Sequence, residues 1–468
     1  MKMNQTDVNA ARPELQQERR AFYRSVFSLV IPMALQNLIN VAVSSADVVM
    51  LGRVGETALS GASLAGQVQF IMTLFLFGLS SGAAVLTAQY WGKRDIRTIE
   101  RVLGIAMRFA LIVGVIFTAA VWAAPGQIMR IFTPEEPVAA EGVKYLKIVS
   151  FSYIFTAFSQ IYLNVMRSVE RVMIATVVYL VSLVLNISLN AVFIFGLLGC
   201  PAMGVSGAAL ATLIARLTEF AIVIVYGLRV NRQVRFRVRD LFGRHRELFR
   251  DFMKYSLPVT ANELLWGVGV SVNSLVIGHM GQAAVAANSA AQVVRQLATV
   301  VSLGIANAAA ILIGKAIGAG REDLAAVYGK RFVGMTLVAG LLGGCVVLAV
   351  RPAVLGIMEL GPEASGYLSF MMFVMSYFVF AQSYNTAMVV GIFRAGGDTR
   401  FGLLIDSTMM WGFSILLGAL GAFVFRWSVP VVYVLLMSDE IVKLPVTTWR
   451  YRSKKWLRNV TRAQEAEE

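Results

Sequence analysis

The sequence predicts an all-α membrane protein with twelve transmembrane helices in two parallel six-helix repeats. Hydrophobic residues make up 57% of the 468 residues and charged residues only 15%, whereas soluble domains average about 45–50% and 25%. Long apolar runs recur along the whole chain. The first half of the chain also aligns with the second half, which indicates a duplication.

Twelve apolar runs are long enough to cross a bilayer, which takes about 20 mainly apolar residues per helix. The segment before them, residues 1–20, is polar and charged and lacks the pattern of a cleavable signal. The first run is therefore expected to remain in the mature chain. The predicted spans are approximately 27–51, 62–87, 100–123, 145–166, 172–196, 205–228, 253–277, 286–313, 331–350, 367–390, 402–424 and 429–447.

Lysines and arginines between the spans predict the orientation, because they are enriched in cytoplasmic loops. The formal net charge is +15. Because these lysines and arginines lie between apolar runs, they indicate membrane topology, and no nucleic-acid partner is expected. They gather in both tails and in the loop between the sixth and seventh spans. An even number of spans separates these segments, so they lie on one side. We expect a monomeric, multi-pass protein of the bacterial inner membrane, in contact with membrane lipid, with both termini cytoplasmic.

The same pattern divides the chain into five parts. The basic linker between the halves is interpreted as a topology anchor beside anionic lipid. The parts are a cytoplasmic N-terminal tail at 1–26, an N-lobe of helices 1–6 at 27–228, the basic cytoplasmic linker at 229–252, a C-lobe of helices 7–12 at 253–447 and a cytoplasmic C-terminal tail at 448–468.

The internal repeat is clearest at a shift of 226 residues. It aligns IPMALQNLINVAVSSADVVMLGRVG at 31–55 with LPVTANELLWGVGVSVNSLVIGHMG at 257–281. Because each half holds an even number of spans, both halves start on the same side and are parallel. Repeats of this kind mark transporters that move two halves around a central substrate site. The aligned pairs include Pro32 with Pro258, Gly52 with Gly278, Gly55 with Gly281, Gly78 with Gly304 and Gly92 with Gly318.

Other function classes leave recognisable patterns that this sequence lacks. It has no nucleophile elbow, no HExxH motif and no phosphate-binding glycine loop, so an enzyme is not expected. Its two cysteines make no disulfide framework. Two histidines without a carboxylate cluster argue against a histidine metal site, and we expect no cofactor.

Asp47 is the only charged residue between Phe27 and Leu51, inside the first span. A carboxylate at the centre of a membrane helix costs about 2.5–3.5 kcal/mol, and such residues are functional candidates. The alternative is a structural aspartate that is hydrogen-bonded or paired with Arg53. The repeat places Asn273 at the equivalent position, so the scaffold does not require an acid there.

The fifth span supplies partners for a cation at Asp47. Asn186 and Asn190 are four residues apart, which places both amides on one face of a helix. Thr212 in the sixth span can add a hydroxyl oxygen. Carboxylate, amide and hydroxyl oxygens suit a sodium ion or a relayed proton, although paired asparagines also join helices without binding an ion. Apart from a sodium ion here, no metal site is expected.

Other polar residues inside the spans are secondary candidates for coupling or substrate binding. Glu263 lies well inside the predicted seventh span, where a carboxylate is costly and is therefore a functional candidate. Asp406, near the cytoplasmic end of the eleventh span, is either functional or an interfacial partner of Arg400. Arg295, like Arg216, either pairs with an acid or extends toward the membrane surface. The remaining candidates are Gln36, Asn37 and Asn273.

With these features in place, the chain resembles the multidrug and toxic compound extrusion (MATE) family over roughly residues 25–447. The resemblance rests on twelve spans in two parallel halves and on three motifs, which are the 31–55 segment quoted above, QYWGKRD at 89–95 and LPVTANELLWGVG at 257–269. It implies a V-shaped pair of lobes around a central cavity and alternating access. It also implies antiport of organic cations, drugs or other amphiphiles against sodium or protons.

The resemblance further implies a cation site. In bacterial members, a first-helix aspartate binds the coupling cation with polar residues of the fifth and sixth helices. Asp47, Asn186, Asn190 and Thr212 fit that pattern. Some members carry an aspartate where this chain has Asn190, which leaves sodium and protons open as the coupling ion.

The C-lobe departs from the family pattern. The acid that many members carry in the tenth helix is missing, with Ser383 near its expected place. A C-lobe role would therefore fall to Glu263 or Asp406.

A flippase for a lipid-linked precursor, from the same wider superfamily, is the alternative function. A basic central cavity would favour it. Because Arg216 and Arg295 are expected to face Asp47 and Glu263, the centre should carry little net positive charge.

Overall fold

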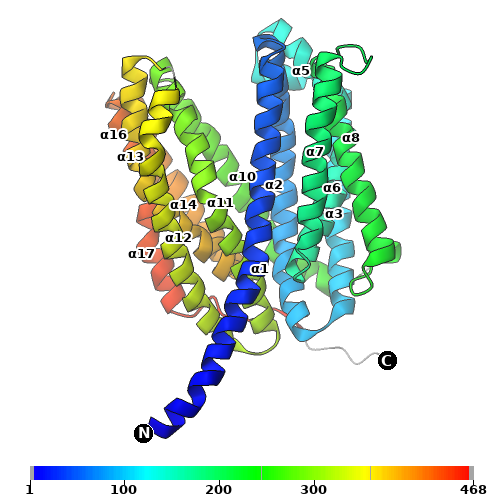
Figure 1. The fold of residues 1–468 in the computed structure, drawn as a ribbon, viewed down its shortest axis with the longest axis vertical. Coiled ribbons are helices and arrows are strands. Elements are labelled where there is room, and N and C mark those ends of the chain that lie inside the picture. The colour runs from blue at the N-terminus through cyan, green and yellow to red at the C-terminus, as the bar shows by residue number, and fades with distance from the viewer. Residues whose placement is uncertain (1–4, 244, 359, 463–468) are drawn as a thin grey trace.

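The computed structural model describes residues 5–243, 245–358 and 360–462, with side chains from residue 17 onward. Within these ranges the chain forms helices and no strand. Figure 1 shows two groups of helices, α1–α8 on the right and α10–α17 on the left, with both ends of the described chain at the lower end. Residues 1–4 and 463–468 of the predicted tails and residue 244 of the linker lie outside the described residues.

The first group supplies six membrane segments and one short connecting helix. The segment α1 continues upstream of the predicted span because the residues before it also favour a helix. The helices are α1 (Gln5–Gly52), α2 (Glu56–Lys93), α3 (Ile96–Ala123), α4 (Pro125–Phe132), α5 (Glu136–Val149), α6 (Ser152–Ser168), α7 (Met173–Phe195) and α8 (Val205–Val225), which ends in a π-helical turn, η1 (Tyr226–Val230).

The second group is less regular. Its segments include three π-helical stretches, which add a residue per turn and often mark functional sites. The short linker helix α9 (Val238–Phe242) precedes this group, whose elements are α10 (Arg246–Gly278), α11 (Gln282–Gly318), α12 (Glu322–Ile357), α13 (Pro362–Thr386), η2 (Ala387–Phe393), α14 (Thr399–Met409), η3 (Met410–Ile415), α15 (Leu416–Ala419), η4 (Leu420–Val424), α16 (Val429–Leu436) and α17 (Asp439–Arg452).

Two predicted spans differ from the structure. The fourth, predicted as one helix at 145–166, is a pair of helices, α5 and α6, bent by 57°. The twelfth, predicted at 429–447, is broken between α16 and α17 and continues to Arg452. Among the described residues, nine helices are long and apolar enough to cross a membrane, or ten with the bent pair. The polar α10 and the broken α16–α17 complete the twelve segments.

Two pairs of aligned glycines, Gly78 with Gly304 and Gly92 with Gly318, lie where helices of the two halves cross. A Cβ on Gly78 of α2 would lie 2.4 Å from the Cα of Thr260 in α10. A Cβ on Gly304 of α11 would lie 3.4 Å from the backbone nitrogen of Ala34 in α1, and Ala34 is the repeat equivalent of Thr260. The pseudo-two-fold relation inferred from the sequence therefore recurs as a pair of matching helix crossings.

The second pair of glycines, Gly92 and Gly318, lies in the last turns of α2 and α11. A Cβ on Gly318 would lie 1.8 Å from the carbonyl oxygen of Gln89, and one on Gly92 would lie 2.0 Å from that of Lys315. Gln89 and Lys315 are also equivalent in the repeat. Helices α2 and α11 thus approach backbone to backbone, which only glycine permits.

The linker and the C-terminal segment pack against the helices. Arg97 of α3 donates to both carboxylate oxygens of Asp240 at 2.8 and 2.9 Å, so the linker is docked and is more than a solvated anchor. The Gln89 amide donates to the carbonyls of Ala395 and Arg458 at 2.7 and 3.1 Å. The buried Gln89 thereby joins α2 to the other half and to the C-terminal segment.

Candidate functional site

Asp47 of α1 lies against α7, the fifth membrane segment. Its Oδ1 accepts a hydrogen bond from the Nδ2 of Asn190 at 2.5 Å. Asn190 is fully buried, whereas Asp47 is partly exposed to a cavity. Helices α1 and α7 pack along each other, so the only acid of the first span contacts an asparagine that the sequence had marked as its partner.

The polar contacts continue from Asn190 to the sixth membrane segment. Asn190 also donates to the Oδ1 of Asn186 at 3.2 Å, and Asn186 donates to the Thr212 hydroxyl at 3.5 Å. The four side chains predicted as a cation site therefore form one continuous chain across α1, α7 and α8. The i, i+4 spacing of the two asparagines places both amides toward α1 and α8.

One buried oxygen among these four hydrogen-bonded side chains has no donor within the described part of the protein. It is the Oδ1 of Asn190, and an unsatisfied buried acceptor costs about 1–3 kcal/mol. A bound cation would supply the missing positive charge. The site thus offers a carboxylate oxygen and an unused amide oxygen in the same place, which are ligands that a hard cation prefers.

The site opens into an N-lobe cavity of about 460 Å³. Its wall near Asp47 is formed by α1, α2, α5, α7 and α8, and its volume is that of a small-molecule site. Polar and aromatic side chains share the lining. The polar and aromatic lining residues include Gln67, Gln69, Phe70, Tyr145, Ser182 and Arg216.

Arg216 does not pair with Asp47. Its Nη1 donates to Glu219 of the same helix at 2.7 Å, and the Glu219 side chain is almost fully buried. The sequence analysis did not single out Glu219, although its i, i+3 spacing from Arg216 is the pattern of a helical ion pair. Asp47 also forms no ion pair with Arg53 in the part of the chain that the structure describes.

In the C-lobe, Glu263 of α10 forms a buried ion pair with Arg394. The Arg394 Nη2 lies 2.7 Å from the Glu263 Oε1, and its Nη1 donates to the Ser81 hydroxyl of α2 at 3.0 Å. The ion-pair partner of Glu263 is therefore Arg394 and not Arg295, although Glu263 and Arg295 line the same cavity. The sequence analysis did not single out Arg394, and the contact of Arg394 with Ser81 joins the two halves.

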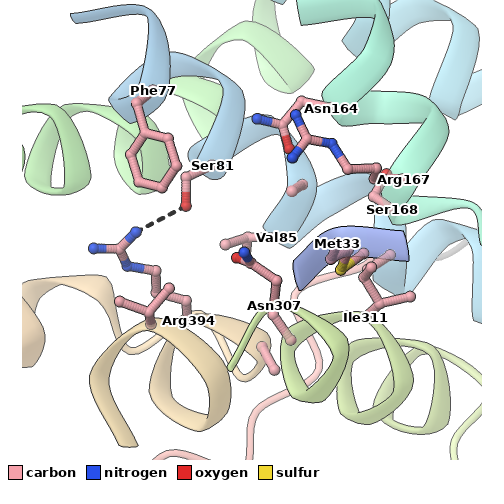
Figure 2. Close-up of a pocket in the computed structure, with 15 residues that line it drawn as sticks. Met33, Phe77, Ser81, Val85, Asn164, Arg167, Ser168, Asn307, Ile311 and Arg394 are labelled. Atoms are coloured by element: carbon pink, nitrogen blue, oxygen red, sulfur yellow. Dashed lines mark hydrogen bonds between the residues drawn. The ribbon is translucent and has the colours of Figure 1, made fainter. Parts of the chain in front are cut away.

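Figure 2 shows the small cavity beside this contact, with Arg394 and Ser81 on one side and Arg167 and Asn164 on the other. Its volume is about 50 Å³, room for little more than ordered water. Ser81 is equivalent to Asn307 in the repeat, and Arg167 corresponds to Arg394 when the alignment is shifted by one more residue. The cavity therefore lies where the equivalent helices of the two halves meet.

Asp406 is paired with Lys443 and not with Arg400. The Lys443 Nζ lies 3.2 Å from Asp406 and also contacts Asp439 and Glu440 of α17, at 3.3 and 2.9 Å. The second Asp406 oxygen accepts from Asn262 at 3.0 Å. The predicted pairing of Asp406 with Arg400 is therefore wrong, since this acid belongs to a charge cluster that reaches a second cavity.

Of the other secondary candidates, Arg295 shares a cavity with Glu263 and Asp406, whereas Gln36, Asn37 and Asn273 do not line any of these three cavities. Gln36 is buried and donates to Val172 and Thr176 at 3.1 and 2.8 Å, so it joins α1 to α7. Asn37 and Asn273 each bury one polar atom that has no hydrogen-bond partner. Arg295 lines the second cavity and stacks over Phe378 at 5.9 Å. Among the described residues no acid forms an ion pair with Arg295, so the first of its two predicted alternatives, pairing with an acid, is wrong.

Comparison with known proteins decides the family. The MatE family model matches residues 32–192 and 258–420, which are the two halves of the repeat. The chain belongs to the MatE family. MatE proteins are transporters, so this protein is a multi-pass membrane transporter, and the family gives no support for an enzyme.

Relatives of this MatE protein are similar over most of their length. A probable multidrug resistance protein NorM from Bradyrhizobium diazoefficiens is 31% identical over 82% of this chain and 83% of its own. Another from Mesorhizobium japonicum is 27% identical over 97% and 98%. A crystal structure of MATE in complex with MaL6 superimposes with a TM-score of 0.84 at 19% identity, covering 92% of this chain and 95% of that one. The fold is therefore that of MATE transporters, twelve helices in two lobes.

Proposed function

We propose that this protein is a secondary antiporter that exports organic cations, drugs or other amphiphilic compounds in exchange for sodium ions or protons. The observation that carries the proposal is the polar chain from Asp47 through Asn190 and Asn186 to Thr212 at the edge of the N-lobe cavity. Family membership and the NorM relatives support the transport of drugs.

The coupling cation binds at Asp47 in this proposal. A proton would neutralise the carboxylate directly. A sodium ion would use the Asp47 carboxylate and the unpaired Asn190 Oδ1, with Asn186 and Thr212 adjacent. Either cation removes the uncompensated negative charge from a membrane helix, where a free carboxylate is unfavourable.

Alternating access follows from the position of this contact. The Asp47–Asn190 hydrogen bond joins α1 to α7, so a cation that competes for the same oxygen changes how the two helices pack. The cation shifts the equilibrium between the two lobe arrangements only to the extent that it binds one arrangement more tightly than the other. Cation and substrate then favour different lobe arrangements, which makes the exchange obligatory.

Motion of the lobes also requires the interface between them to separate. The Arg394–Ser81 hydrogen bond and the Gln89 contacts hold α2 to the second half in this state. Both chain ends lie at that end of the molecule (Figure 1). We assign it to the cytoplasm of a bacterial inner membrane, so the inward opening breaks these contacts, in a protein that acts as a monomer.

The alternative, a flippase for a lipid-linked precursor, has less support. A basic cavity would hold a diphosphate head group. In the N-lobe cavity, however, Arg216 is neutralised by Glu219, while no cation among the described residues forms an ion pair with Asp47. The charge of this cavity is therefore suited to a cation.

Uptake of ethidium by cells that lack their own exporters tests the proposed function. Cells that express the protein should accumulate less ethidium than cells with an empty vector. Collapsing the sodium or proton gradient with a selective ionophore should remove the difference. Equal accumulation, or a difference that survives the loss of both gradients, would contradict the antiporter.

A further inference from the structure

Residues 453–462, the C-terminal strap, follow α17 and cross from the C-lobe to the N-lobe. The strap is fixed in the C-lobe by Trp456, whose side chain is only 1% exposed and stacks on Tyr451 with the ring centroids 5.9 Å apart. A Cβ on Gly396, in the connection between η2 and α14, would overlap the Trp456 carbonyl oxygen. The glycine therefore lets the strap pass directly over this connection.

The far end of the strap holds α2 of the N-lobe. The fully buried Gln89 donates to the Arg458 carbonyl at 3.1 Å and accepts from the Val460 backbone nitrogen at 2.8 Å. The backbone nitrogen of Arg462 donates to the Tyr90 hydroxyl at 3.2 Å. Two consecutive residues of α2 are therefore bonded to a segment whose other end is fixed in the C-lobe.

The tip of the strap is held by ion pairs at the surface. The Arg462 guanidinium contacts Asp251 and Glu247 of α10, and Lys93 of α2 donates to the Arg462 carbonyl. The Glu247 side chain is 66% exposed, and exposed ion pairs are weak and screened by salt. The strap is thus anchored firmly at Trp456 and reversibly at its tip.

The repeat shows which contact the strap replaces. Gln89 of α2 is equivalent to Lys315 of α11. The Lys315 Nζ crosses the interface in the opposite direction and contacts both oxygens of Glu170 at 2.7 and 2.9 Å. Glu170 lies in the turn between α6 and α7 and also accepts from Trp91 at 3.1 Å. One of the two equivalent crossings is therefore an ion pair between the lobes.

The equivalent turn of the C-lobe, between η2 and α14, has the same backbone but no acid. Glu170 and Gly397 both have a positive φ, of 65° and 74°. Their backbone nitrogens donate to the corresponding carbonyls of Arg167 and Arg394 at 3.0 and 2.9 Å. A Cβ on Gly397 would lie 2.6 Å from the Cγ1 of Val460. The strap thus fills the place that the Glu170 side chain takes in the other half.

We propose that the C-terminal strap is a releasable lock, which replaces the second ion pair between the lobes and holds the cytoplasmic side of the protein closed. Opening toward the cytoplasm separates α2 from the C-lobe, so the strap must first release Gln89 and Tyr90. The inference rests on the alternating access in the proposed function and adds a control that neither repeat supplies. Because the lock consists of a few hydrogen bonds and screened ion pairs, it can open without unfolding a membrane helix.

The distance between two spin labels at the cytoplasmic ends of the lobes tests this lock. Met173 begins α7 and Arg400 lies in the first turn of α14; both are exposed, and they correspond in the repeat. Met173→Cys and Arg400→Cys are labelled in a protein that also carries Cys200→Ser and Cys345→Ser. The distance distribution is measured by double electron–electron resonance on the purified protein in detergent, without substrate or ion gradient.

A chain that ends at Leu457 keeps Trp456 but lacks the part of the strap that contacts α2. The ratio of open to closed molecules should rise about a hundredfold, as the loss of several hydrogen bonds predicts, and appear as a population at longer distance. A chain that ends at Arg462 keeps the strap and is the matched control, with the wild-type distribution expected. Gln89→Leu in the full chain removes the Gln89 bonds to the strap, together with the one to Ala395, and should also open the protein.

A rebuilt ion pair tests whether the strap replaces the missing acid. In the chain that ends at Leu457, Gln89→Lys together with Gly397→Glu reproduces the arrangement of Lys315 and Glu170 in the other half. This double variant should restore the short distance, whereas Gln89→Lys alone should not. A double variant that stays at the long distance would contradict the equivalence of the two crossings.

The outcomes separate this inference from the proposed function. The wild-type distribution in the chain that ends at Leu457, or in Gln89→Leu where the shortened chain does not fold, would overturn the lock. Equal opening of the chain that ends at Arg462 would place the effect outside the strap and would also overturn it. Because the distances are measured without substrate or gradient, a protein whose strap controls the distance but which exports no ethidium would contradict only the antiporter.

Discussion

The carboxylate of Asp47 lies 2.5 Å from the amide nitrogen of Asn190, and this hydrogen bond joins the first membrane helix to the fifth. The bond uses one oxygen of the acid and one donor of the amide. The Asn190 carbonyl oxygen remains buried and unpaired. The contact therefore holds two helices together and leaves a ligand available for a cation.

Asp47→Asn should abolish export. The amide keeps the shape and can still bond to α7, but it can neither bind a sodium ion by charge nor take up a proton. Drug-sensitive cells that produce the variant should be as susceptible as cells without the protein, at an equal amount in the membrane. Glu56→Gln, an exposed acid at the start of α2, is the control. Full resistance with Asp47→Asn would remove this residue from the mechanism.

Asn190→Ala should weaken the cation dependence of transport. It deletes both the bond to Asp47 and the unpaired oxygen, so the concentration of the coupling ion at half-maximal transport should rise about tenfold, the effect of about 1.4 kcal/mol. The assay is ethidium efflux from vesicles at graded sodium concentration and at graded pH. Asn40→Ala, on the exposed face of α1, should leave both curves in place. Unchanged curves for Asn190→Ala would exclude its side chain from the site.

Glu263→Gln should destabilise the protein because it leaves Arg394 as a buried charge without its acid. Breaking such a pair typically costs about 3–5 kcal/mol, whereas removing both partners costs much less. The double variant Glu263→Gln/Arg394→Gln should therefore have a higher thermal unfolding temperature in detergent than the single variant. If the two single effects simply add, the ion pair contributes no coupling and the assignment fails.

Gly318→Ala should disrupt the interface between α2 and α11. Its Cβ would lie 1.8 Å from the Gln89 carbonyl oxygen, so the helices would have to separate. We expect a lower unfolding temperature and reduced export. Gly334→Ala, in α12, has open space at the Cβ position and should be neutral or slightly stabilising, since alanine favours a helix over glycine. Equal unfolding temperatures for the two variants would show that this crossing does not support the structure.

The sequence predicted the N-lobe chain of contacts because its geometry is mostly local. Asn186 and Asn190 lie one helical turn apart, so their common face follows from the periodicity of the helix. Asp47 stood out because no other charge shares its span. The duplication predicted which positions of the two halves are equivalent, and the equivalent Gly78 and Gly304 lie at matching helix crossings.

The C-lobe contacts were harder to predict because they depend on irregular backbone. Arg394 follows the π-helical segment η2, which changes the direction of the residues after it. Lys443, Asp439 and Glu440 follow the break between α16 and α17, which the apolar pattern of the twelfth span did not reveal. Glu219 is the exception, since its spacing from Arg216 was readable in the sequence.

Efflux of an organic cation from proteoliposomes, with sodium and pH gradients imposed separately, tests the central claim most directly. The wild-type protein should expel ethidium against its gradient when one of the two ions is driven in the opposite direction, and Asp47→Asn should show no response to either gradient. Efflux by Asp47→Asn that still follows the ion gradient would contradict the assignment of the coupling site to Asp47.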